Sequence, residues 1–202
     1  MKLIIESQYF PPLTCYKGSC QLSNIVFEQY DHFQKMSFRN RLLMANANGV
    51  SVLSVPVEQG RNQKTLMKEV RIANRQSWQL QHWRSLESAY NRSPWFEFYR
   101  DELAALYKKP FHFLLDWNLS CFEWTMEKLE WEISISRTKS YQKTYDPAAW
   151  IDRRGAILPK NYKGFPPVKY HQVFEEKLGF LPNLSILDLL FCEGKRAGEL
   201  LK

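Results

Sequence analysis

The feature that most constrains the fold is a change in the spacing of hydrophobic residues near residue 76. Before it, short apolar runs alternate with turn-forming Gly, Asn and Pro, which is typical of strands. After it, apolar residues recur at helical spacing, as Trp78 and Leu86 do. The sequence therefore predicts an α/β fold, mainly strands over residues 1–75 and mainly helices over residues 76–202.

The strands of the first half are expected in four places. The opening run "LIIESQYF" is ended by Pro11 and Pro12, because proline cannot continue a sheet ladder. A second strand is expected from Ile25 to about Gln34, and "LLMANANGVSVLSVPVE" predicts a hairpin with an Asn-Gly turn. A further strand, "MKEVRIA", should follow the polar loop "EQGRNQKT", and residues 16–24 should form two helical turns.

The helices of the second half carry recognisable start signals. Ser77 is the predicted cap of the first helix, and Pro94 and Pro110 open the second and third. Residues 134–168 are predicted to be an irregular loop, either functional or flexible. Short helices are expected in "YHQVFEEKLGF" and "LSILDLLFCEG". Since no repeat or linker interrupts the chain, residues 1–202 predict one domain, a Rossmann-like sheet half with a helical layer.

Composition narrows the class of protein. With 202 residues and 45% hydrophobic content, the chain can bury one substantial core. No apolar run approaches the ~18 residues that span a bilayer, and the N-terminus lacks the pattern of a signal peptide. The cysteines show no metal-ligand spacing, so we expect reduced thiols in a cytoplasmic protein; two disulfides are the alternative. They are Cys15, Cys20, Cys121 and Cys192.

The net charge of +7 is spread along the chain without a run of four cations. It predicts either a basic, solubilising surface or a site for an anionic ligand such as a phosphate or nucleotide. Nucleic acid is not an expected partner. The sequence also lacks a glycine-rich phosphate loop, a nucleophile elbow and paired histidines, so it identifies no cofactor and predicts no metal site.

The stretch "YDHFQKMSFRNR", residues 30–41, concentrates hydrogen-bonding side chains after an apolar strand. On the expected strand, His32 lies on a polar face, which is either a site wall or a solvated edge. Arg39 and Arg41 flank Asn40, and alternation would place both guanidinium groups on one side, an arrangement that suits a carboxylate or phosphate. Surface arginines that bridge to acids are the alternative. We interpret the stretch as a site wall.

The predicted first helix places His82 on the same face as Trp78 and Leu86, so its imidazole should point inward. An inward histidine is either a satisfied structural residue or a general acid or base, since its ordinary pKa lies near neutrality.

Several motifs in order resemble the WbqC-like protein family: "QYFPPLTCY", "YDHFQKMSFRNR", "LSVPVE", a Trp-His-Tyr helix and "PNLSILDLLF". The resemblance covers nearly the whole chain, and its last motif is similar to members from the Bacteroides group. The chain departs from the family pattern in lacking a proline after the first glutamine. It also carries His32 where many members have an acid. The matching polar positions are Gln8, Tyr9, Asp31, Gln34, Lys35, Asn40, Arg41, Trp78, His82 and Tyr90.

The resemblance implies a transferase of O-antigen, lipopolysaccharide or other surface-polysaccharide biosynthesis, transferring an aminoacyl (glycyl) or other acyl group. On this hypothesis the catalytic candidates are His82, His32 and Asp31. Lys35 and Arg41 would hold the anion. The other matching positions, Gln8, Tyr9, Gln34, Asn40, Trp78 and Tyr90, would contact substrate. The expected partners are an anionic donor, a nucleotide sugar or an acyl thioester, and a glycan acceptor.

The alternative function is a non-catalytic binding or scaffold protein of a glycan-assembly complex. It rests on the aromatic run Trp95, Phe96, Phe98 and Tyr99, since exposed aromatic residues mark partner surfaces. Convergence of the polar candidates in one pocket would favour the enzyme, and scattered positions would favour the scaffold. The candidates for this test are Gln8, Gln34, Asn40, Arg41 and His82.

Overall fold

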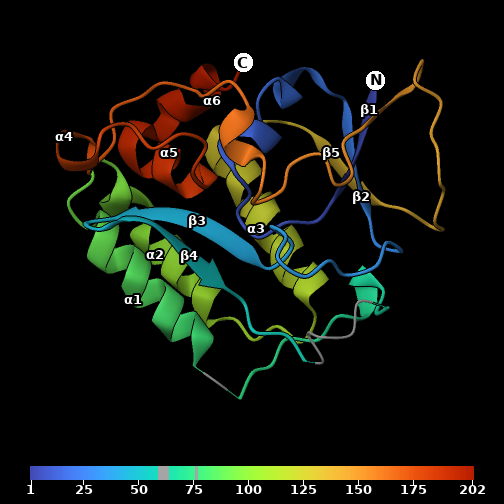
Figure 1. Ribbon diagram of the computed structural model, residues 1–202, viewed down its shortest axis with the longest axis horizontal. Coiled ribbons are helices and arrows are strands. Elements are labelled where there is room, and N and C mark those ends of the chain that lie inside the picture. The colour runs from blue at the N-terminus through green and yellow to red at the C-terminus, as the bar shows by residue number, and fades with distance from the viewer. Residues whose placement is uncertain (59–63, 76) are drawn as a thin grey trace.

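The computed structural model describes residues 1–58, 64–75 and 77–202 (Figure 1). Its larger sheet is parallel, with the strand order β5-β2-β1-β6. These strands are β1 (Lys2–Glu6), β2 (Asn24–Glu28), β5 (Ser134–Arg137) and β6 (Trp150–Asp152). The predicted hairpin is present as the antiparallel pair β3 (Arg41–Asn46) and β4 (Gly49–Ser54). The predicted class, one mixed α/β domain, is confirmed.

The longer helices cover both sheets. Figure 1 shows α3 between the parallel sheet and the hairpin, with α1 and α2 on the far side of the hairpin. The helices of the described residues are α1 (Trp78–Tyr90), α2 (Phe96–Lys108), α3 (Leu114–Leu129), α4 (Glu175–Leu178), α5 (Ile186–Glu193) and α6 (Ala197–Leu200). None of them combines the length and apolarity needed to cross a bilayer, within the described ranges.

The core lies where the apolar face of the parallel sheet meets α3. In β2, Ile25 and Phe27 alternate with residues of the opposite face, as the period of two for a strand requires. The ring of Phe27 packs edge-on against Phe122 of α3, with 5.0 Å between ring centroids. Because Phe27 faces α3, the alternate residues of β2, including Glu28 at its end, point to the opposite face of the sheet.

Some sequence predictions of local structure are wrong. The second strand ends at Glu28 and not near Gln34, because the backbone N–H of Gln29 turns aside to donate to the Thr138 hydroxyl (3.2 Å). The segment "MKEVRIA" contains a 3-10 helix, Met67–Glu69, and isolated bridges instead of a strand.

Other boundaries shift. The first 3-10 turns are Leu13–Cys15 and Ser19–Gln21, and the second and third helices begin at Phe96 and Leu114. The expected irregular loop 134–168 contains β5 and β6. Residues 59–63 of the polar loop lie outside the described residues.

The order of the parallel strands creates a switch in direction beside β1. The chain runs from β1 to β2 and then β5 on one side, and only later places β6 on the other side. In open α/β sheets, ligands bind outside the carboxyl ends of the strands at such a switch point. We call this end of the sheet the carboxyl edge; it comprises residues 6–8, 28–31, 137–138 and 152–155.

Candidate functional site

Two buried carboxylates end neighbouring strands at the carboxyl edge. Glu6 of β1 and Glu28 of β2 are partners in the parallel register, so their side chains share one face of the sheet. They are only 2% and 0% exposed. Glu6 accepts hydrogen bonds from Gln8 Nε2 (2.8 Å) and from the backbone N–H of Gly155 (2.8 Å). These donors offset part of the cost of burying the carboxylate.

The partners of the Glu28 carboxylate come from the segments that follow β2, β5 and β6. Its Oε1 accepts from the Thr138 hydroxyl (2.8 Å) and from the backbone N–H of Tyr30 (2.9 Å). Its Oε2 lies 3.4 Å from Nη1 of Arg154. The same guanidinium donates to Asp152 Oδ2 (2.6 Å), and this pairing holds the pKa of the Asp152 carboxyl below its usual value. Opposite charges thus link the end of β2 to the end of β6, with Glu28 buried and Asp152 exposed.

Arg154 also fastens the loop that follows β5. Its guanidinium donates to the backbone carbonyls of Gln142 (2.8 Å) and Lys143 (3.1 Å). The group lies over the rings of Tyr141 and Tyr145, 5.6 and 5.0 Å from their centroids. Such cation–π contacts stabilise the arrangement further. The loop predicted to be irregular is therefore tied to the carboxyl edge by one side chain.

A buried arginine lies beside the end of β1. The Arg39 side chain is 1% exposed, pairs with the carboxylate of Asp31 and donates to Gln34 Oε1 (3.0 Å). Asn118 of α3 donates to the Arg39 carbonyl (2.8 Å) and to Ser7 Oγ (3.4 Å). The stretch that the sequence singled out therefore reaches the carboxyl edge, as a folded loop and not as a strand face.

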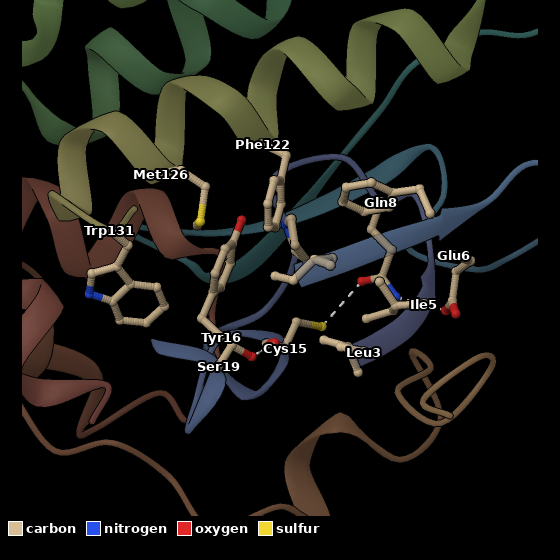
Figure 2. A pocket seen from close by; sticks show the side chains of 13 residues that line it. Leu3, Ile5, Glu6, Gln8, Cys15, Tyr16, Ser19, Phe122, Met126 and Trp131 are labelled. Carbon is tan, nitrogen blue, oxygen red and sulfur yellow. Dashed lines mark hydrogen bonds between the residues drawn. The ribbon is translucent and has the colours of Figure 1, made fainter. Parts of the chain in front are cut away.

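Two spaces adjoin these groups. An open hollow of about 550 Å³ is lined by Gln34, Lys35 and Lys160, among others. On the other sheet face, a cavity of about 20 Å³ lies beside Gln8 and Cys15, and Figure 2 shows the Cys15 thiol pointing to Gln8 Oε1, 3.3 Å away. That cavity has room for a water molecule. Burial raises the pKa of Cys15, so the group is a thiol and not a reactive thiolate.

The predicted site residues divide into two groups. Gln8 and Asp31 belong to the carboxyl edge, where Gln8 donates to Glu6. Asp31 and Gln34 both bind Arg39, and Lys35 lies on the same loop in the open hollow. His32 is exposed, and its backbone N–H donates to Asp31 Oδ1 (2.8 Å).

Asn40 and Arg41 stand at the start of the hairpin. The Asn40 amide donates to the Val55 carbonyl (2.9 Å), and Nε of Arg41 is buried without a partner among the described residues. Arg39 and Arg41 do not form the expected pair of guanidinium groups, because β3 begins only at Arg41 and Arg39 is turned into the loop.

The second group, Tyr9, Trp78 and His82, lies in the core. The Tyr9 hydroxyl is 3.0 Å from His82 Nδ1 and also bonds the Tyr107 hydroxyl. The Trp78 ring packs edge-on against His82, 5.2 Å between centroids. His82 is 5% exposed, and burial lowers its pKa from 6.5 to about 4, opposed by a hydrogen bond to the Ser54 backbone. The imidazole is therefore neutral at pH 7.

Tyr90 belongs to a separate buried cluster. Its hydroxyl donates to Asp188 Oδ1 (2.7 Å) and accepts from the Ala45 backbone (3.0 Å). Tyr170 and Gln172 donate to the other carboxylate oxygen of Asp188. Burial raises the pKa of Asp188. The polar candidates thus do not converge in one pocket, so this criterion favours the scaffold, and an enzyme hypothesis has to rest on the groups at the carboxyl edge alone.

Sequence reasoning missed Glu6, Glu28 and Arg154. A signal for the carboxylates existed, because "KLIIE" and "NIVFE" are both apolar strands that end in glutamate. Arg154 had no comparable signal, since its buried partner Glu28 is 126 positions away in the sequence. Within the described residues, no group of three or more His, Cys, Asp or Glu is arranged to hold a metal ion.

The aromatic run behind the scaffold hypothesis is mostly internal. Phe96 and Tyr99 are buried, Trp95 is partly buried, and Phe98 is 71% exposed. The Trp95 and Phe98 rings lie 5.0 Å apart, so the exposed aromatic surface of this run is small.

A model of the WbqC-like protein family matches residues 6–157. The matched segment begins at Glu6 and ends shortly after β6, so it contains the whole carboxyl edge. Among curated proteins, the uncharacterized protein Rv1507c of Mycobacterium tuberculosis is 25% identical over 233 residues, covering 98% of this chain and 96% of that protein. No solved structure shows significant similarity.

Proposed function

The chain belongs to the WbqC-like protein family, and from this premise we propose that it is an acyl transferase of surface-polysaccharide biosynthesis. The group transferred would be aminoacyl, such as glycyl, or another acyl group. The observation that supports the proposal is the presence of buried ionisable groups at the carboxyl edge, Glu6 and Glu28, and of the buried Arg39, which pairs with Asp31 of that edge. Burying such groups is costly, and they gather at functional sites. The cytoplasmic location and the Bacteroides-type subgroup stay predictions.

The donor would bind in the open hollow beside Lys35 and Lys160. Its volume of about 550 Å³ is in the range of ligand sites, and its lining includes cations without an acid. An acyl thioester that carries phosphate groups, such as a coenzyme A thioester, has the charge that this lining favours. Gln34 links the hollow to the buried Arg39 and so holds the loop in place.

We assign proton transfer to His32 among the three catalytic candidates. His82 is 5% exposed with Nδ1 already bonded, and Asp31 is paired with Arg39, whereas His32 is exposed on the same loop. The acceptor hydroxyl oxygen attacks the thioester carbonyl carbon, a C–O bond forms and the C–S bond breaks. The hydroxyl proton passes to the His32 imidazole and then to the leaving thiolate, so the step is balanced.

The test measures thiol release from acetyl- and glycyl-coenzyme A, with a panel of nucleotide-linked sugars as acceptors. We expect release that depends on an acceptor, and a fall of about a hundredfold in kcat in His32→Asn, because a general base contributes about 10²–10⁴. His171→Asn is the matched control, since His171 is exposed beside α4. Equal kcat in both variants would refute the role of His32. Absence of release with every pair would favour the scaffold function.

A further inference from the structure

A second hollow lies between the loop after β1 and the loop after β6, with a volume of about 360 Å³. Lys17 and Thr14 line it from the first loop, and Arg153 from the second. Its remaining wall is apolar and consists of Ala156, Ile157, Phe165 and Pro166. The lining contains two cations and no acid, so its field favours an anion.

The two cations are free to take an external partner. The Arg153 backbone N–H donates to the Ile4 carbonyl (2.9 Å), which holds the residue in line with the sheet. Its guanidinium makes no hydrogen bond or ion pair with any residue that the structure describes, and neither does the Lys17 ammonium group. The adjacent Arg154, by contrast, is engaged by Glu28 and other groups. Two unpaired cations therefore face one space.

Thr14 adds an unsatisfied donor. The residue is 8% exposed, and its hydroxyl oxygen is buried without a hydrogen-bond partner in the described part of the chain. Buried hydroxyl groups in folded proteins are nearly always paired, so an unpaired one in the lining of a hollow indicates a missing acceptor. A phosphate oxygen is such an acceptor.

The topology of the sheet points to the same place by a separate argument. The chain leaves β1 towards β2, and β6 lies on the opposite side of β1. The crevice outside the carboxyl ends of β1 and β6 is where an open α/β sheet binds its ligand. The hollow lies there, because its polar lining residues follow these two strands.

We propose that this hollow binds the phosphate of a phosphate ester that carries a ring, a nucleotide or a sugar phosphate. Lys17 and Arg153 supply the counter-charge, the Thr14 hydroxyl donates to a phosphate oxygen, and Phe165 packs against the ring. The inference goes beyond the proposed acyl transfer, since it concerns binding alone and is tested without turnover.

The experiment is calorimetric titration of the full chain with inorganic pyrophosphate, uridine diphosphate and glucose 1-phosphate at low ionic strength. Arg153→Gln and Lys17→Gln should each weaken binding about tenfold, as the loss of a charged hydrogen bond does. Lys108→Gln removes the same charge at the end of α2, outside this lining, and should leave the affinity unchanged. Thr14→Val should bind more weakly while its thermal unfolding midpoint is equal or higher, because it loses an unpaired buried hydroxyl.

The three probes distinguish the sources of the phosphate. Tighter binding of uridine diphosphate than of pyrophosphate identifies a nucleotide, and tighter binding of glucose 1-phosphate identifies a sugar phosphate. Absence of binding by all three probes would overturn the proposal. An equal loss of affinity in Lys108→Gln would also overturn it, because binding would then depend only on the net charge. A loss of affinity in Lys35→Gln alone would overturn it too, because the anion would then bind in the hollow beside Lys35 and Lys160.

Discussion

Acidification should destabilise the protein through His82. Because the folded state lowers the pKa of this imidazole from 6.5 to about 4, the unfolded chain binds its proton more tightly. The stabilisation from neutral His82 is full above pH 6.5 and is lost as the pH falls from 6.5 through about 4. At about 1.4 kcal/mol per pKa unit, the loss is about 3 kcal/mol.

The assay is urea unfolding at about pH 7.5 and about pH 4, for the native chain and for His82→Gln, which is neutral at both pH values. The other titrating groups contribute equally to both proteins, so the difference in their pH dependence isolates His82. We expect the native chain to lose about 3 kcal/mol more than the variant. An equal loss of stability in the native chain and in His82→Gln would show that the imidazole titrates in the folded protein as it does in the unfolded chain. It would refute the conclusion that His82 is held neutral by burial beside Tyr9.

Three further perturbations follow from particular contacts. In Gly194→Ala the new Cβ would lie 2.3 Å from the Trp95 ring, at a positive φ of 57°, so we expect a loss of about 2–4 kcal/mol in chemical unfolding; a loss under about 1 kcal/mol would contradict the contact. Tyr170→Phe removes a donor to the buried carboxylate of Asp188 and should cost about 2 kcal/mol at neutral pH. Because burial raises the pKa of Asp188, its carboxyl gains a proton as the pH falls, and the loss of stability caused by Tyr170→Phe should then shrink. An equal loss at neutral and at acidic pH would contradict the titration of Asp188. Arg154→Ala should free the loop after β5, seen as faster tryptic cleavage at Lys143, and unchanged cleavage would show that other contacts hold the loop.

The parts of the fold that local pattern determines could be predicted from the sequence. The turn signal "NANG" predicted the β3–β4 hairpin, whose two turn residues are Ala47 and Asn48. The spacing of Trp78, His82 and Leu86 predicted both α1 and the inward direction of the histidine. These features depend on contacts within one strand pair or one helix face, so the spacing of hydrophobic residues along the chain is enough to predict them.

The edge strands could not be predicted in the same way. β5 and β6 each pack a single isoleucine, Ile135 and Ile151, against the core; of their other residues only Trp150 is partly buried, and the rest are exposed. They are strands because β2 and β1 supply hydrogen-bond partners from remote parts of the chain. Strand pairing between remote parts of the chain cannot be predicted from the local composition of the strands.

The candidate site was predicted only in part, for the same reason. The sequence indicated that Asp31, Gln34 and Arg39 have a polar role, but not that the chain leaves the sheet at Glu28 and folds back as a loop. The network around Arg154 joins residues more than a hundred positions apart, and only the sheet register brings them together.

The most direct test of the carboxyl edge as the functional site is amide chemical-shift mapping of the labelled protein on addition of acetyl-coenzyme A and of uridine diphosphate. We predict that acetyl-coenzyme A shifts amides at residues 34–37 and 158–160, and that uridine diphosphate shifts amides at residues 14–17 and 153–157 and at Phe165, because these segments line the two hollows. Shifts confined to α2 around Phe98, or no shifts with either compound, would contradict the account and favour a partner-binding surface.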